Sequence, residues 1–143
     1  MKISMLCSGM LGLNVLKKVR KKYNVSCVFT DRNSIEIIEY CFKNDIKYFK
    51  NNPRNGKGIN FLKQFKVDVI VSVNYLYLIE KEMINYPSVI SINIHGSLLP
   101  KYRGRTPHVW AIINGERKTG ITVHRISEGC DEGEIIKQKE IAI

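Results

Sequence analysis

The sequence predicts an α/β fold in which an open, mostly parallel sheet carries helices on both faces. Apolar runs of strand length alternate with segments of helical periodicity through residue 95, which is typical of a doubly wound sheet. The clearest buried strand, residues 67–73, is continuous and β-branched. The composition, 44% hydrophobic and 25% charged over 143 residues, suits a globular chain that needs neither disulfides nor metal to hold its core. We therefore expect one domain spanning residues 1–143.

The strands before residue 96 are predicted from short apolar runs bounded by turn residues. They are expected at residues 2–7, 25–30, 46–49, 67–73 and 89–95. A glycine turn at residues 8–12 is expected to lead into the first helix. The remaining predicted elements of this part are a helix at 34–43, a loop at 51–58, a short helix at 59–65 and a helical turn at 80–85.

Two of these helices show apolar residues at helical spacing, which predicts the face that each one buries. The residues are Leu13, Leu16 and Val19 in the first helix and Ile35, Ile38 and Phe42 in the second.

The pattern changes after residue 95. A loop marked by proline and glycine covers residues 96–107 and leads to a helix at residues 108–113. Two alternating segments follow, residues 120–126 and 134–141, and we expect them to pair as a hairpin. Because the chain stops after a strand with no closing helix, we interpret it as truncated at the C-terminus, a fragment of a longer protein.

The sequence gives no sign of membrane or secretory targeting. The longest nearly uncharged apolar run, residues 69–79, is shorter than the roughly 20 residues that a membrane span needs. The four cysteines, at positions 7, 27, 41 and 130, have no metal-binding or redox spacing. We expect reduced, mostly buried thiols, no metal site and a cytoplasmic protein.

The chain is basic, with 23 Lys and Arg residues against 13 Asp and Glu residues, a formal net charge of +10. One interpretation is an anionic partner such as a nucleotide, a phosphorylated metabolite or RNA. The other is compositional drift, in which the dense cluster within residues 17–22 is the solvated face of a helix. Charge alone does not predict RNA binding.

A glycine turn lies between the first strand and the first helix. Gly9 and Gly12 are spaced so that backbone N–H groups face a phosphate at a helix N-terminus, and this predicts Gly9 as a substrate contact. The spacing is not the three-glycine dinucleotide fingerprint, so a plain strand-to-helix turn is the alternative.

The predicted strand 89–95 places two polar side chains together. Asn93 and His95 share one face because successive strand residues alternate, and both lie at the carboxyl end, where ligand crevices form in open α/β sheets. Farther along, Asp131 precedes Glu132 and Gly133 in a predicted loop. Each group has a structural alternative, namely hydrogen-bonded side chains at a strand end and an aspartate in a turn.

The second part of the chain carries an ordered set of motifs. They are Asn93-Ile94-His95-Gly96-Ser97-Leu98-Leu99-Pro100-Lys101-Tyr102-Arg103-Gly104, then Pro107, Asn114-Gly115-Glu116, Thr119-Gly120-Ile121-Thr122 and Asp131-x-Gly133. This set resembles the formyltransferases that use 10-formyltetrahydrofolate, over about residues 67–141, and the earlier half is compatible with the Rossmann-like layer of that family. The resemblance implies an enzyme of one-carbon metabolism with Asn93, His95 and Asp131 as its catalytic set and no metal.

The resemblance also implies where the substrates bind. The pterin end of the folate is expected beside Tyr75, Tyr77, Leu78 and Ile79, with Gly129 and Asp131 on a loop that closes the other side. The acceptor is expected near Ser97, Arg103, Arg105, His108 and Trp110. Residues 104–111 look more like the sugar-nucleotide N-formyltransferases than like the methionyl-tRNA enzymes.

The leading prediction is formyl transfer to the amine of a nucleotide-linked amino sugar, a small anionic substrate. Methionyl-tRNA formylation, with a nucleic-acid partner, and glycinamide ribonucleotide formylation are the alternatives within this chemistry. A non-catalytic fragment that binds folate or nucleotide is the alternative of another class, and a homodimer would cover apolar surface left exposed.

Overall fold

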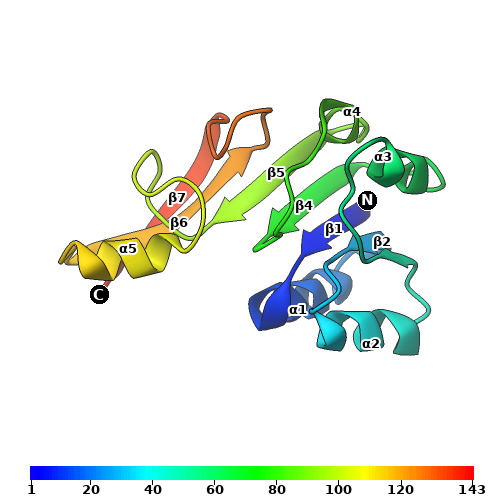
Figure 1. The fold of residues 1–143 in the computed structure, drawn as a ribbon, viewed down its shortest axis with the longest axis horizontal. Coiled ribbons are helices and arrows are strands. Elements are labelled where there is room, and N and C mark those ends of the chain that lie inside the picture. The colour runs from blue at the N-terminus through cyan, green and yellow to red at the C-terminus, as the bar shows by residue number, and fades with distance from the viewer. The chain divides into compact units, whose positions relative to one another are not determined.

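The computed structural model describes residues 1–143, and the chain divides into two compact units, Met1–Ser91 and Ile92–Ile143. The prediction of a single domain is not tested by this division. The elements are labelled in Figure 1. In chain order they are β1 (Lys2–Cys7), α1 (Gly9–Arg20), β2 (Asn24–Phe29), α2 (Ile35–Lys43), β3 (Tyr48–Phe49), α3 (Lys57–Leu62), β4 (Val69–Val73), α4 (Lys81–Ile84), β5 (Ile90–His95), α5 (Pro107–Ile113), β6 (Lys118–Arg125) and β7 (Ile135–Ala142).

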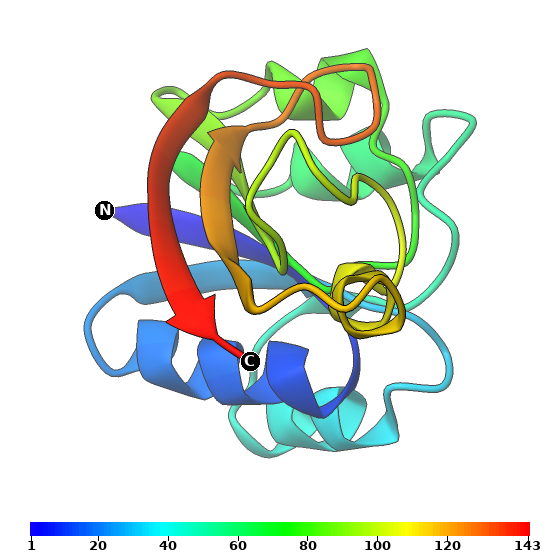
Figure 2. The same cartoon turned by 90° about the vertical axis from the view of Figure 1, so that its left-hand side faces the viewer.

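The first unit is a parallel sheet with strand order β3-β2-β1-β4. Helices α1 and α2 lie on one side of these strands, and α3 and α4 lie on the other (Figures 1 and 2). Central strand β4 is buried at all five residues, as expected for a parallel strand that is covered on both faces. The predicted α/β fold with a mostly parallel sheet and two helical layers is confirmed.

Helix α1 packs closely against the end of β1 because Gly12 lacks a side chain. A Cβ atom at this position would lie 2.9 Å from the Cβ atom of Cys7. Leu13 and Leu16 are buried on the same face, as predicted. The basic residues of the last turn interact favourably with the negative end of the helix dipole.

The predicted buried face of α2 is wrong. Phe42 is 80% exposed and Ile35 is 52% exposed, whereas Ile37 and Cys41 are buried. Both stripes have helical spacing, so periodicity does not decide which one faces the sheet. The buried stripe continues from Ser34, whose hydroxyl oxygen accepts the Gly9 N–H.

The second unit is built on an antiparallel ladder. Residues 92–95 of β5 pair with β6, and β6 pairs with β7 along nearly its whole length, which confirms the predicted hairpin. Figure 2 shows β6 and β7 running side by side. The segment between β5 and α5 forms no regular element, and three of its residues, Tyr102, Gly104 and Thr106, have positive φ.

The predicted elements are present, with ends that differ by one to three residues. Residues 9–12, predicted as a turn, are the first turn of α1, and α3 begins two residues before its predicted start. Cys7, Cys27 and Cys41 are buried thiols, as expected, whereas Cys130 is exposed. None of the helices has the length and apolar content needed to cross a membrane.

Candidate active site

The β5–β6 ladder positions two of the predicted catalytic residues. Asn93 lies opposite His124, and His95 lies opposite Thr122. Because the strand side chains alternate, both predicted groups lie on the face that receives the loop after β6. The predicted shared face of Asn93 and His95 is therefore confirmed.

Asp131 reaches this face from the loop between β6 and β7. Its Oδ1 atom accepts a hydrogen bond from the Asn93 amide at 3.1 Å, and its Oδ2 atom lies 3.4 Å from Nδ1 of His95. The backbone N–H of Gly104 also donates to Oδ2, at 2.9 Å. The structure thus brings Asn93, His95 and Asp131, which are up to 38 residues apart in the chain, into one cluster within the second unit.

The hydrogen bonds of His95 fix its ring. Nε2 lies 2.8 Å from the carbonyl oxygen of Tyr102, and a carbonyl can only accept, so Nε2 carries a proton. Nδ1, the other ring nitrogen, lies 3.4 Å from Oδ2 of Asp131. The ring is thus held between a main-chain carbonyl and a carboxylate, with Nδ1 on the side of Asp131.

His124 belongs to the cluster and was missed by the sequence analysis. Its Nε2 atom lies 3.2 Å from the Asn93 amide nitrogen and 3.3 Å from Oδ1 of Asp131, and Nδ1 donates to the carbonyl of Arg125 at 2.8 Å. Alternation along β6 puts His124 on the same face as Thr122, and the expected hairpin contained this signal. What the sequence lacked was the register that sets it opposite Asn93.

The electrostatics of the cluster favour a charged pair. Burial raises the pKa of Asp131. The hydrogen bonds from His124 and from the Gly104 N–H, together with the charges of the nearby imidazoles, lower this pKa by more, to about 2. Burial likewise opposes the charged form of His124, but its hydrogen bonds to Asp131 and to the Arg125 carbonyl raise the pKa of His124 above 6.5. Asp131 is therefore ionised at neutral and mildly acidic pH.

The raised pKa of His124 predicts a pH-dependent contribution to stability. Folding favours the imidazolium, so its contribution is complete below the unfolded pKa of 6.5 and is lost as pH rises through the folded value. The difference in unfolding free energy between wild type and His124→Gln should therefore be larger near about pH 5.5 than near about pH 8.5. Urea denaturation at several pH values measures this difference.

His108→Gln provides the matched control, since His108 is exposed on α5 and lies outside the cluster. Its unfolding free energy should follow that of the wild type at every pH. An equal loss of stability for His124→Gln at acidic and alkaline pH would contradict the assigned ion pair.

The other predicted residues of the second unit differ in their surroundings. Ser97 is buried, and its hydroxyl donates to the Lys101 carbonyl at 2.6 Å, which gives it a structural role in the loop. Arg103 lies 3.7 Å from the Glu132 carboxylate, and both side chains of this pair are exposed. The remaining residues are exposed: Arg105, His108, Trp110 and Gly129. Their substrate contacts stay predictions.

Five predicted residues lie in the first unit. The N–H of Gly9 donates to the Ser34 hydroxyl at 2.9 Å, so this group already has a partner. Tyr75 and Tyr77 make an edge-to-face contact, and the hydroxyl of Tyr75 is buried without a hydrogen-bond partner. Along this segment, residues 74–79, exposed and half-buried side chains alternate, with Leu78 exposed and Ile79 half-buried. The folate contacts of this segment also stay predictions.

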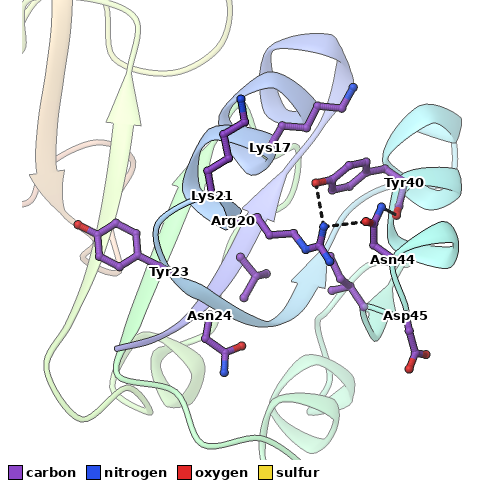
Figure 3. Close-up of a pocket in the computed structure, with 10 residues that line it drawn as sticks. Lys17, Arg20, Lys21, Tyr23, Asn24, Tyr40, Asn44 and Asp45 are labelled. Atoms are coloured by element: carbon purple, nitrogen blue, oxygen red, sulfur yellow. Dashed lines mark hydrogen bonds between the residues drawn. The ribbon is translucent and has the colours of Figure 1, made fainter.

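A basic pocket of about 700 Å³ lies elsewhere in the first unit, and none of the predicted site residues lines it (Figure 3). Arg20 donates there to the Asn44 side chain at 2.7 Å, and the Tyr40 ring lies beneath Lys17 and Arg20. The basic cluster of residues 17–22 thus lines part of an open groove between the ends of α1 and α2.

The structure contains no group of three or more His, Cys, Asp or Glu side chains arranged to hold a metal ion.

Comparison with known protein families and sequences gives one consistent match. The family model described as formyl transferase matches residues 2–143. The bifunctional polymyxin resistance protein ArnA of Wigglesworthia glossinidia brevipalpis is 36% identical over 94% of this chain and 22% of its own length. A methionyl-tRNA formyltransferase of Kosmotoga olearia is 37% identical over 89% of this chain and 44% of its own length. The chain therefore spans less than half the length of these curated relatives.

Solved structures match the fold of the whole chain. A phosphoribosylglycinamide formyltransferase from Bacillus halodurans is 25% identical, covers 100% of this chain with 80% of its own length, and gives a TM-score of 0.86. WlaRD, a sugar 3N-formyl transferase in the presence of dTDP and 5-N-formyl-THF, is 25% identical, with a TM-score of 0.75 over 100% of this chain and 52% of its own.

Proposed function

The chain belongs to the formyl transferase family, and from this premise we propose that it transfers a formyl group from 10-formyltetrahydrofolate to the amine of a nucleotide-linked amino sugar. One observation carries the proposal. In the second unit the carboxylate of Asp131 lies 3.1 Å from the amide of Asn93 and 3.4 Å from the imidazole of His95, and all three side chains are half-buried or buried. Two hydrogen-bond donors beside a carboxylate suit acyl transfer to an amine.

Asn93 and His95 stabilise the charge that develops in the reaction. The acceptor nitrogen forms a bond to the formyl carbon, and negative charge builds on the formyl oxygen. The Asn93 amide and the Nδ1–H of His95 donate hydrogen bonds to that oxygen. Donors held in place before the charge appears are effective, and each is worth about 10²–10³ in rate.

Asp131 acts through its charge. With a pKa of about 2 the carboxylate is ionised, and its charge beside Nδ1 orients the ring of His95. The proton that the acceptor amine loses passes along the carboxylate, directly or through water, to the nitrogen that releases the formyl group. His124 holds Oδ1 of Asp131, the oxygen that also accepts the Asn93 amide, in this arrangement.

The segment predicted to bind the folate, residues 74–79, contains two tyrosines whose rings suit a flat ligand. The hydroxyl of Tyr75 is buried without a hydrogen-bond partner, and the rings of Tyr75 and Tyr77 pack edge to face. A flat heterocycle with polar edges suits an aromatic segment that has an unused hydroxyl. Tyr75 and Tyr77 are thus proposed to hold the folate.

Three observations support an amino-sugar acceptor. A sugar 3N-formyl transferase shares the fold, with a TM-score of 0.75 over 100% of this chain. Trp110 is 52% exposed on α5, where an apolar face is available to a sugar or base. Arg103 is exposed on the loop that carries Gly104, in keeping with an anionic acceptor.

Methionyl-tRNA is the second candidate acceptor. The Kosmotoga olearia enzyme is as similar in sequence as ArnA, and a net charge of +10 suits a polyanionic partner. Glycinamide ribonucleotide follows, on the strength of the Bacillus halodurans fold match. A cytoplasmic location and a homodimer stay predictions.

An acceptor panel tests the proposal. The protein is incubated with 10-formyltetrahydrofolate and with amino-sugar nucleotides, methionyl-tRNA or glycinamide ribonucleotide, and tetrahydrofolate release and the mass of each acceptor are followed. We expect formylation of an amino-sugar nucleotide and a loss of about 10²-fold or more in Asn93→Ala and in His95→Ala. Both variants keep the acceptor contacts outside the cluster.

Other outcomes would correct the proposal in different ways. Formylation of methionyl-tRNA alone would remove the sugar and keep the chemistry. Folate binding without transfer to any acceptor would favour a non-catalytic binding fragment. Wild-type turnover in both alanine variants would refute the assigned roles.

A further inference from the structure

One residue, Tyr102, connects His95 to the surface of the second unit. Its backbone carbonyl accepts the Nε2–H of His95 at 2.8 Å, and its phenol donates to Oε1 of Glu116 at 2.9 Å. The amide of Asn114 donates to the same phenol oxygen at 3.1 Å. A single residue thus touches the cluster with its main chain and a separate polar group with its side chain.

The conformation of Tyr102 needs support. Its φ of +57° lies in the left-handed region, which is unfavourable for a bulky aromatic residue. Such a conformation persists only where the surrounding contacts hold it. The phenol contacts with Glu116 and Asn114 supply that support, because they fix the far end of the side chain.

Glu116 also holds the residue before Tyr102. The Nζ atom of Lys101 lies 2.9 Å from Oε1 of Glu116, the atom that accepts the Tyr102 hydroxyl. Two residues after Tyr102, the N–H of Gly104 donates to Asp131. One short stretch of loop therefore supplies a carbonyl to His95 and an N–H to Asp131. Glu116 holds the same stretch through its contacts with the side chains of Lys101 and Tyr102.

We propose that Tyr102 and Glu116 form a positioning clamp, in which the phenol–carboxylate hydrogen bond holds the Tyr102 carbonyl on His95 and keeps the ring oriented for donation from Nδ1. The clamp rests on the proposed role of His95. Neither clamp side chain touches a reacting atom in this scheme. Both are half-buried, so water competes for their hydrogen bonds, and breaking the clamp frees the loop without unfolding the unit.

The direct test follows the ring proton of His95 and does not depend on activity. The Nε2–H of His95 is assigned by nuclear magnetic resonance, and its exchange with water is measured in wild type, Tyr102→Phe and Glu116→Gln. We expect exchange about tenfold faster in Tyr102→Phe and a smaller acceleration in Glu116→Gln, which keeps a weaker, neutral acceptor. Glu140→Gln is the matched control, since Glu140 pairs with Lys118 on the β6–β7 ladder, and it should exchange as wild type does.

Kinetics provide the second readout. Under the proposed function, kcat should fall by about tenfold in Tyr102→Phe while KM for donor and acceptor stays within about twofold, because the loss falls on the transition state. Unchanged exchange of the His95 proton in both clamp variants would overturn the clamp. Faster exchange in a protein that formylates no acceptor would leave the clamp standing and remove the proposed function.

Discussion

Replacement of Asp131 by asparagine is expected to lower kcat for formyl transfer by about 10³-fold while the chain stays folded. The amide has the shape of the carboxylate, and its oxygen can still accept the N–H of Gly104. Asparagine also tolerates the φ of +52° at this position. What is lost is the negative charge beside His95 and His124.

Glu132→Gln is the control for this variant because it removes the same charge from the next residue of the loop. Glu132 contacts Arg103 rather than the cluster, so kcat should remain close to the wild-type value. Steady-state kinetics with the acceptor identified by the panel give the comparison. Comparable losses in the two variants would show that the general charge of the loop matters, and not Asp131 itself.

Gly133→Ala is expected to lower the unfolding free energy by about 2–3 kcal/mol and to reduce formyl transfer as well. A Cβ atom at Gly133 would overlap the backbone carbonyl of Arg125. That carbonyl belongs to the end of β6, where the Arg125 N–H also pairs with the Glu134 carbonyl. Relief of the overlap must move the loop, and Asp131 is only two residues away.

Urea denaturation and a formyl-transfer assay check both parts of this prediction. Gly129→Ala is the control for stability, since the atoms that its Cβ would meet belong to the flexible side chain of Glu132. It should unfold at nearly the wild-type urea concentration. Equal stability of Gly133→Ala and Gly129→Ala would mean that the end of β6 moves more freely than the ladder implies.

Much of the fold could be predicted because it follows from local pattern. Strand β4 reads as buried from its β-branched run, and the shared face of Asn93 and His95 follows from strand alternation. The buried face of α2 could not be predicted, because two apolar stripes fit the same period. Only packing against the sheet separates Ile37 and Cys41 from Ile35 and Phe42.

The site was predictable only where motifs carried it. His124 was missed because its role depends on the β5–β6 register, which is a long-range property of the fold. Tyr102 lies within the motif of residues 93–104, but it contacts His95 through its main-chain carbonyl, and the residue type does not reveal such a contact. The contact between Asp131 and His95 likewise depends on a loop that returns 36 residues along the chain.

Each ring nitrogen of His95 faces an oxygen atom, and this arrangement bears on the activation free energy of the reaction. In water, solvent molecules must reorient to stabilise a new charge, and that reorientation costs free energy. In the proposed mechanism the imidazole of His95 avoids this reorganisation cost, because the Tyr102 carbonyl and the Asp131 carboxylate already orient its ring. The reorganisation that free solvent would undergo in every turnover has taken place once, when the chain folded.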